Sequence, residues 1–491
     1  MPRALDLTLG DDGPTYRRIA RALVREIGRG RLRPGHPLPG TRPLAESLGV
    51  HRNTVIAAYR ELVAEGWAVT EEARGTFVAP DFPVRRRAER GARVASSPSF
   101  ALPPPIGVGI PAPQPPLSLG GGVVDVRLAP RLDLARAYRR ALLRAPKLLR
   151  YGDPRGHDGL RAALVTLVTE SRGVVCSAEQ VMVTRGSQMA TALVARTLFS
   201  PGDVVAVEAL GYPPTWAALR AAGAELVPVP VDEGGLVVEA VAAIAAERRV
   251  RAVVVTPHHQ YPTTVTLSAP RRLALLALAR RERMIVIEDD YDHEFHYEGR
   301  PVLPIASEDS DGVVVYVGTF SKVLAPGLRT GFVVAPSPVI ERMAEARVLF
   351  DRQGDLVLEA ALAELLTDGT LERHIRRVRR VYRARRDAFV IDAARVLGGL
   401  LSFEPPRGGT AIWARADGVD VDALAERARD RGIPFQPGSS LTLPTAPRAL
   451  ARAAAHSLRI GFVSLGDAER VRALGELARA AKDLPKRPGR G

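Results

Sequence analysis

The sequence predicts two domains of different classes: a small all-α winged helix-turn-helix domain, followed by a large α/β domain. The chain has 491 residues, more than the roughly 250–300 residues that one hydrophobic core usually organises. Residues 81–117 interrupt the globular pattern with an arginine-rich and then proline-rich stretch. Beyond residue 150, short β-branched runs alternate with helical segments. This alternation is typical of a mostly parallel sheet covered by helices on both faces.

These observations predict a first domain over residues 1–80, a linker over 81–117, a large domain over 118–484 and a basic tail over 485–491. The linker has eight prolines between Pro98 and Pro116, a density that disfavours helix and favours extended polyproline geometry. We therefore expect a semi-rigid spacer between two domains that fold separately.

Composition excludes several classes of protein. Apolar residues make up 46% and charged residues 25%, which is ordinary for a globular chain. No run of eighteen apolar residues is present, and the N-terminus lacks a signal-peptide apolar region, so we expect a cytoplasmic protein without a membrane partner. The single cysteine, Cys176, excludes a disulfide framework and a multi-cysteine zinc site. No metal site is predicted.

Positive charge is concentrated at the N-terminal end. Residues 1–95 hold 17 arginines, no lysine and 11 acidic residues, which is +6 of the total +15. Such a concentration favours nucleic acid as the partner of this end. The alternative is compositional, since the whole chain uses 65 arginines and only four lysines.

Hydrophobic spacing in the first domain predicts three helices, over residues 14–29, 41–48 and 52–65. Gly49 is suited to end the second helix in a tight turn, and two helices joined in this way form a helix-turn-helix. Trp67–Thr70 and Thr76–Ala79 then predict a two-stranded wing.

In this motif the N-terminus of the second helix of the pair enters the major groove of DNA. Arginine can pair with guanine and asparagine with adenine through two hydrogen bonds. The alternative is a solvated polar face without a partner. The candidate DNA-binding residues are Thr41, Arg42, His51, Arg52, Asn53, Thr54 and, at the wing tip, Gly75.

The run LRPGHPLPGTRPLAESLGVHRNTVIAAYRELVAEGW, followed by GTFVA, resembles the winged helix-turn-helix of the GntR family of regulators. The resemblance covers residues 14–79 and implies that the protein binds double-stranded DNA through Arg42, Arg52, Asn53, Thr54 and the wing at Gly75. One departure is His51, where the family usually has serine or threonine, which are good helix N-caps.

Polar motifs in the large domain follow predicted strands, where ligands bind in sheets of this class. Gly186-Ser187-Gln188 opens a helix and could hold a phosphate through its amides and hydroxyl. The strand Met284–Ile287 leads to Asp289 and Tyr291, and the strand Val313–Val317 leads to Thr319 and Lys322. The other predicted strands are Val181–Val183, Val204–Val207, Leu226–Val229, Ala252–Val255 and Gly331–Ala335.

A lysine, a carboxylate and a phosphate-binding loop at neighbouring strand ends suit pyridoxal phosphate, which needs an amine, a partner for its ring nitrogen and a cationic phosphate site. Lys322 could instead be a surface lysine and Asp289 a helix cap. However, Lys322 persists in a chain that otherwise uses arginine, and a guanidinium cannot form a Schiff base.

Residues 118–480 resemble a fold-type I aminotransferase, a pyridoxal phosphate-dependent transferase. The motifs are YGDPRGHDGLR, TRGSQMA, GYPP, HHQYPTTVTLS, IEDDYDHEF, GTFSKVLAPGLRTGF and LRIGF. The resemblance implies that Lys322 forms the Schiff base, that Asp289 pairs with the ring nitrogen and that Tyr291 binds the phenolic oxygen. It further assigns ring contacts to Tyr212 and Tyr261, the phosphate to Ser187, Gln188, Thr319, Arg329 and the other subunit's Tyr151, and a substrate carboxylate to Arg459.

Several positions depart from the aminotransferase pattern. Tyr261 replaces an asparagine, Thr264 a glycine and Ala209 an aspartate. Pro214 and Thr215 occupy a stretch where some relatives supply a second arginine. The cofactor site is therefore expected to be complete, and the departures favour the cofactor itself as the signal.

A GntR-type module joined to an aminotransferase-like domain is similar to the MocR/GabR subfamily. The resemblance implies a bacterial transcription regulator that forms head-to-tail homodimers. Its large domain would sense pyridoxal phosphate or a small amino compound through aldimine exchange at Lys322. One alternative is an active aminotransferase that retains a DNA-binding module, and another is a large domain that serves only as a dimerisation scaffold.

Overall fold

The computed structural model of the chain describes residues 7–10, 12–81, 97–102, 114–299 and 302–484. Its contacts divide the chain into two compact units, Met1–Pro104 and Pro105–Gly491. Most of the predicted linker and the whole predicted tail over 485–491 lie outside the described residues. In the part of the chain that the structure describes, no helix is both long and apolar enough to cross a membrane.

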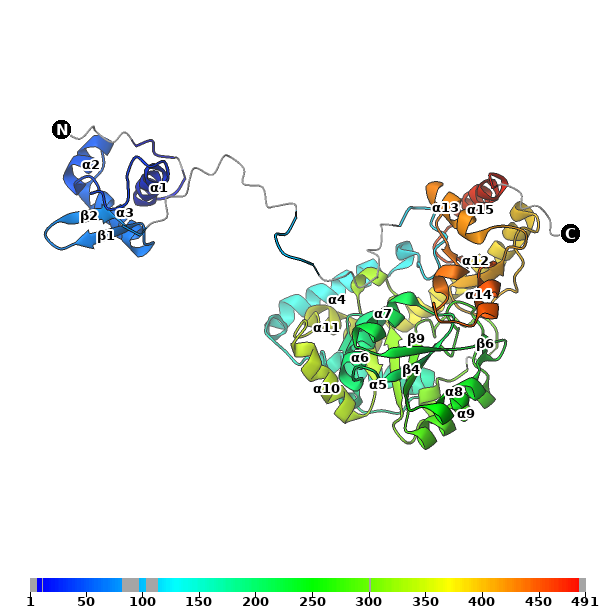
Figure 1. Cartoon of the computed structure of the whole chain (residues 1–491). Helices are drawn as coiled ribbons and strands as arrows, with labels where there is room; N and C mark the ends of the chain where they lie inside the picture. The colour runs from blue at the N-terminus through cyan, green and yellow to red at the C-terminus, as the bar shows by residue number, and fades with distance from the viewer. Residues whose placement is uncertain (1–6, 11, 82–96, 103–113, 300–301, 485–491) are drawn as a thin grey trace. The chain divides into compact units, whose positions relative to one another are not determined.

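The first unit is a three-helix domain with a two-stranded antiparallel wing (Figure 1). Its bounds lie within one or two residues of those predicted from the sequence, so the winged helix-turn-helix is confirmed. The elements are α1 (Thr15–Gly28), α2 (Thr41–Leu48), α3 (Arg52–Ala64), β1 (Ala68–Glu71) and β2 (Gly75–Val78).

The three helices enclose a small core. Ile19, Leu23, Val55 and Leu62 are fully buried in it, and each contributes about 1.5–3 kcal/mol by leaving water. Between α2 and α3, Gly49 has a φ of 64°, a left-handed conformation that glycine adopts without a Cβ penalty. The core and this turn together fix the angle at which α3 is presented.

The second unit is built on a seven-stranded sheet in the order β3-β11-β10-β9-β8-β4-β5. The sheet is mixed: β11 is antiparallel to both of its neighbours, whereas the remaining pairs are parallel. The strands are β3 (Val181–Thr184), β4 (Val204–Glu208), β5 (Glu225–Val229), β8 (Val250–Val255), β9 (Ile285–Asp290), β10 (Val314–Thr319) and β11 (Gly331–Val334).

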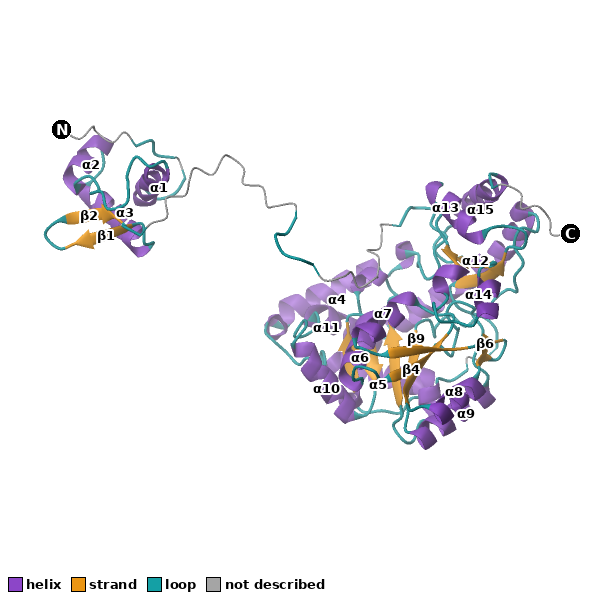
Figure 2. Ribbon diagram, viewed as in Figure 1, coloured by secondary structure: helices purple, strands orange, loops and turns teal. Residues whose placement is uncertain are grey.

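Helices cover both faces of this sheet (Figure 2). Alternate residues of β4 separate into two cores: Val205 packs with Leu193 of α6, and Ala206 packs with Leu275 of α9. Burial on both faces explains why the strands are apolar runs rather than alternating patterns. The helices are α4 (Arg131–Arg144), α5 (Asp158–Arg172), α6 (Ser187–Leu198), α7 (Pro213–Ala221), α8 (Val238–Glu247), α9 (Ala269–Glu282), α10 (Ser337–Val348) and α11 (Leu356–Thr367).

A C-terminal lobe, yellow to red in Figure 1, adds a three-stranded antiparallel sheet in the order β12-β14-β13 and four helices. This sheet was not predicted. A two-stranded hairpin of β6 (Val231–Asp232) and β7 (Gly235–Leu236) lies apart from it. The lobe comprises α12 (Thr370–Leu397), β12 (Ala411–Arg415), α13 (Val421–Asp430), β13 (Gln436–Pro437), α14 (Arg448–Ala454), β14 (Ser457–Gly461) and α15 (Asp467–Lys482).

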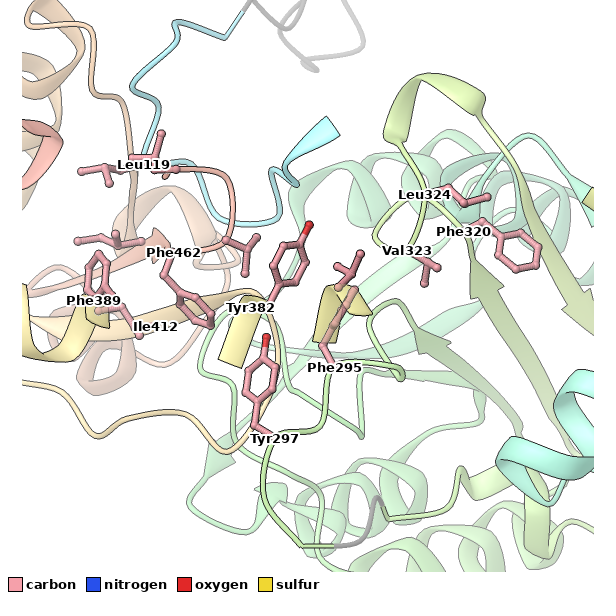
Figure 3. Close-up of a cluster of buried hydrophobic side chains, with 14 of the residues drawn as sticks. Leu119, Phe295, Tyr297, Phe320, Val323, Leu324, Tyr382, Phe389, Ile412 and Phe462 are labelled. Atoms are coloured by element: carbon pink, nitrogen blue, oxygen red, sulfur yellow. The ribbon is translucent and has the colours of Figure 1, made fainter. Parts of the chain in front are cut away.

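One apolar cluster joins the lobe to the main sheet, and Figure 3 shows its larger side chains. Tyr382 and Phe389 of α12 contribute to it from the lobe, and Phe320 and Val323 from the loop after β10. Tyr382 also accepts a hydrogen bond from the Asp125 amide at 3.3 Å. Because Phe320 and Val323 are buried here, the segment between them, which includes Lys322, is held in a fixed place.

Candidate functional site

A cavity of about 460 Å³ lies where β9 and β10 end. It gathers most of the predicted cofactor residues from segments far apart in the sequence: Ser187, Gln188, Tyr212, Tyr261, Asp289, Tyr291, Thr319, Lys322, Arg329 and Arg459. Tyr151 does not line it. The Tyr151 side chain is 80% exposed, and the Arg352 guanidinium lies over its ring at 4.8 Å.

Lys322 projects into the cavity from the loop after β10. Its Nζ donates a hydrogen bond to the Gly122 carbonyl at 2.7 Å. Burial, and then the nearby charge of Arg459, lower the pKa of Lys322 from 10.5 to about 8. About a tenth of the amine is therefore neutral at pH 7, far more than for an ordinary lysine, and only the neutral amine is a nucleophile.

Asp289 enters the same cavity from β9. Its Oδ1 is buried and has no hydrogen-bond partner among the described residues. Burial and then the charges of Asp290 and Asp292 raise the pKa of Asp289 to about 7. A buried carboxylate without a partner is costly, and a cationic ring nitrogen would supply the missing donor and charge.

The other end of the cavity is suited to a phosphate. Gly186, with a φ of 81°, directly precedes α6, and Ser187, the first residue of that helix, lines the cavity. The first amides of a helix have no partner within the helix and are available to an anion. A Cβ at Gly186 would come within 3.1 Å of Arg329 Nη2, so the loop and the guanidinium are in close contact. Arg329 also donates to the Arg185 carbonyl at 3.0 Å. Helix amides and a guanidinium thus converge where a dianion would bind.

Three tyrosines form the cavity's aromatic wall. The rings of Tyr212 and Tyr261 meet edge to face, with centroids 5.3 Å apart. Tyr261 accepts a hydrogen bond from Gln436 at 3.0 Å. The Tyr291 hydroxyl donates to the His259 carbonyl at 2.8 Å, and its own oxygen remains able to accept.

Arg459, on β14, is fully buried. Its Nη1 donates to the Pro262 carbonyl at 2.8 Å, and its guanidinium lies 4.4 Å from the centroid of the Tyr261 ring. Its Nε and Nη2 have no hydrogen-bond partner among the described residues. Two unpaired donors on a buried guanidinium match the two oxygens of a carboxylate.

Sequence reasoning missed the segment that closes the cavity beside Arg459 and Lys322. Gly121 and Gly122 lie so close that a Cβ on Gly121 would be 2.6 Å from Arg459 Nε, and one on Gly122 would be 2.9 Å from Lys322 Nζ. Gln436 accepts from the Gly121 amide at 3.1 Å, and Gln114 lines the same cavity. The run of three glycines at 120–122 was the available signal, since glycine marks close backbone approach.

The predicted DNA-contacting tip lies at the surface of the first unit. Arg42, Arg52, Asn53 and Gly75 are exposed, and Arg52 Nε donates to the Thr41 hydroxyl at 3.2 Å. His51 acts as the N-cap of α3, because its Nδ1 accepts from the Asn53 amide at 3.2 Å. The histidine thus satisfies the role that serine or threonine has in the family.

Comparison with known proteins shows that each unit matches a known family. Residues 119–476 match the family "Aminotransferase class I and II", and residues 15–78 match "Bacterial regulatory proteins, gntR family". The probable rhizopine catabolism regulatory protein MocR of Rhizobium meliloti is 34% identical over 87% of each chain. The HTH-type transcriptional regulator TauR of Rhodobacter capsulatus is 33% identical over 97% of this chain and 98% of its own.

Among solved structures, the α-aminoadipate aminotransferase LysN of Thermus thermophilus, complexed with N-(5'-phosphopyridoxyl)-L-leucine, superposes with a TM-score of 0.67 at 28% identity. The match covers 74% of this chain and 92% of that one. The fold and the cavity therefore define a pyridoxal phosphate-binding domain of the aminotransferase class, joined to a DNA-binding winged helix-turn-helix. The chain belongs to the MocR-type regulators of the GntR family.

Proposed function

We propose that this transcription regulator changes its DNA binding when a small amino compound bearing a carboxylate enters the pyridoxal phosphate pocket. The observation that carries the proposal is Arg459, a buried guanidinium with two unpaired donors. A ligand carboxylate would accept hydrogen bonds from these two donors, whereas the phosphate and ring nitrogen of the cofactor would be bound by other residues of the cavity. This geometry favours the amino-compound signal over the cofactor-only signal that the sequence favoured.

The same proposal assigns roles around the cofactor. Pyridoxal phosphate supplies an aldehyde that bonds reversibly to primary amines. Lys322 is the residue that would hold this aldehyde, and Asp289 would hold the ring nitrogen. Ser187, Gln188, Thr319 and Arg329 would bind the phosphate, with Tyr212, Tyr261 and Tyr291 around the ring.

A head-to-tail homodimer is the second part of the proposal. Leu132 and Leu143 of α4 are 73% and 68% exposed, and the partner subunit would cover them. A second cavity of about 930 Å³ is lined by α4 residues and by Arg329, which also lines the cofactor cavity. Through this second cavity, Tyr151 of the partner subunit would reach the part of the cofactor cavity that would bind the phosphate.

The tip of α3 supplies the DNA contacts in this proposal. Thr41, Arg42, His51, Arg52, Asn53, Thr54 and Gly75 would contact double-stranded DNA, and we place the protein in the bacterial cytoplasm with its DNA. An energetic coupling of about 1–3 kcal/mol between pocket and tip is enough to change promoter occupancy several-fold or more.

An active aminotransferase is the alternative, favoured by the presence of Lys322, Asp289 and Arg459 in one cavity. The two functions differ in their products. In a single-turnover incubation of the holoprotein with amino acids, an enzyme would release one equivalent of keto acid. A regulator would change its affinity for DNA without releasing stoichiometric keto acid.

The deciding experiment uses DNA fragments selected from the source genome by the full-length protein. Their affinity is measured by fluorescence anisotropy with cofactor alone and then with a panel of amino acids. We expect at least one amino acid to shift the affinity several-fold in the wild type and not in Arg459→Gln, with the cofactor still bound in both. A response to cofactor alone, unchanged by all amino acids and by Arg459→Gln, would overturn the proposal.

A further inference from the structure

A group of histidines lies next to the cofactor cavity, but their side chains do not line it. His258 and His259 precede Tyr261 in the chain, and His296 follows the loop after β9. We name these three residues the histidine cluster. One ligand nitrogen from each of them lies within 4.8 Å of the others.

Three ring nitrogens of the histidine cluster are buried without a hydrogen-bond partner among the described residues. His258 is 4% exposed, and neither of its ring nitrogens has a hydrogen-bond partner among the described residues. His296 Nδ1 is also buried and unpartnered in this part of the chain. Burying such polar atoms without partners costs free energy, and a bound ligand would recover it.

His259 is oriented by a carboxylate. Its Nδ1 lies 2.7 Å from Asp292 Oδ1, and this contact leaves Nε2 as the ligand nitrogen. A carboxylate that fixes the outer nitrogen of a histidine is the common outer-shell arrangement around protein-bound metals. Asp292 also supplies negative charge, which partly balances a dication.

We propose that His258, His259 and His296 bind one divalent late transition-metal ion, with zinc as the reference. Three imidazole ligands suit zinc and its neighbours and leave a fourth coordination position for water or another donor. The absence of a cysteine pair suggested no metal site from the sequence, and this proposal replaces that expectation.

A second combination, His258 with Asp290 and His293, also has ligand atoms within 4.8 Å, but it is already occupied by other interactions. Asp290 Oδ2 accepts from Tyr316 at 2.7 Å and lies 3.0 Å from His293 Nδ1. The contact between Asp290 and His293 therefore already engages one carboxylate oxygen and one ring nitrogen of this combination.

Metal binding at the histidine cluster would alter the positions of residues that line the cofactor cavity. The His259 carbonyl accepts the Tyr291 hydroxyl at 2.8 Å. Asp289 and Tyr291 line the cavity, whereas Asp292, next in the chain, holds His259. The two sites therefore share the segments 258–261 and 289–292.

The test uses full-length protein without a polyhistidine tag, stripped with a chelator and titrated with Co²⁺ and Zn²⁺. We expect one equivalent of Co²⁺ per chain, with the visible absorption bands of a four- or five-coordinate nitrogen site, displaced by Zn²⁺. His296→Ala, at a half-buried position, should weaken Co²⁺ binding at least tenfold, whereas His36→Ala, at an exposed position in the first unit, should not.

Three outcomes would overturn the proposal. One is the absence of stoichiometric binding at micromolar Co²⁺. Another is equal binding by His296→Ala and the wild type. The third is loss of binding in His293→Ala with binding retained in His296→Ala, which would assign the metal to the second combination. Circular dichroism of each variant, and its uptake of pyridoxal phosphate, verify that the fold is intact.

Discussion

At the scale of single residues, the chemistry of the large unit depends on charges buried without their usual partners. Lys322 and Asp289 face one cavity with their pKa values moved toward neutrality, to about 8 and about 7. Two ionisable groups that both titrate near neutral pH in one cavity are typical of a functional site rather than of a structural ion pair. We expect them to set the conditions under which the cofactor can be taken up.

Replacing Lys322 should abolish covalent retention of the cofactor. Among the described residues, Lys147 and Lys482 are exposed and do not line the cavity, so neither can substitute. We expect Lys322→Ala, and equally the charge-retaining Lys322→Arg, to lose the visible absorption of lysine-bound pyridoxal phosphate after desalting. A variant that kept this absorption would show that another amine holds the cofactor.

The pH dependence of uptake follows from the lowered pKa of Lys322. Because the neutral amine reacts, the rate of cofactor uptake by the apoprotein should rise about tenfold per pH unit below about 8 and level off above it. Removing the Arg459 charge in Arg459→Gln should raise the pKa of Lys322 and move the inflection to higher pH. Stopped-flow absorbance at several pH values measures both profiles, and an inflection near 10.5 in the wild type would contradict the assignment.

Sequence reasoning located the residues at strand ends because the apolar runs before them are unambiguous. Lys322 and Asp289 each follow such a run. It missed Gly121 and Gln436 because nothing local to either residue indicates that they meet across the cavity. It placed Arg459 only by resemblance, and its unpaired nitrogens depend on three-dimensional packing.

At the scale of elements, the helix-turn-helix could be predicted almost residue by residue, since its caps and spacing are local signals. The predicted helix over 52–65 is observed as Arg52–Ala64. In contrast, the antiparallel orientation of β11 relative to its neighbours could not be predicted, because an apolar run that is buried on both faces has the same composition in either direction. The short strands β12 and β13 lacked a distinguishing pattern for a similar reason.

The N-terminus of α3 should carry base recognition. We expect Arg52→Ala to lose about 1–3 kcal/mol of binding to selected DNA and much less to random DNA, if Arg52 contacts a base. Arg21→Ala, an exposed arginine on α1, provides a matched control for the loss of one positive charge. Equal losses on selected and random DNA would instead identify Arg52 as a phosphate contact.

At the scale of the whole molecule, we expect the exposed leucines of α4 to be buried between two copies of the chain. Leu143 is 68% exposed and lines the larger cavity beside α4. Burying one leucine stabilises an interface by about 1.5–3 kcal/mol, and a charge in its place would remain costly to bury.

We therefore expect Leu143→Glu to raise the dimer dissociation constant at least tenfold, as measured by analytical ultracentrifugation. Val175→Glu replaces another exposed residue, 86% accessible, and should leave the dimer unchanged. If both variants sediment as the wild type does, α4 does not form the interface.

The segment 114–122 has a further consequence for how far the DNA-binding unit can reach. Gln114 lines the cofactor cavity, Gly121 packs against Arg459, and Gly122 packs against Lys322. The tether to the first unit is therefore anchored in the wall of the ligand pocket. Releasing those residues would lengthen the tether by at most about 30 Å, at roughly 3.3–3.6 Å per residue. Because tether length sets the effective concentration of one module at a neighbouring half-site, anchoring or releasing this segment would tune avidity for DNA without altering a single base contact.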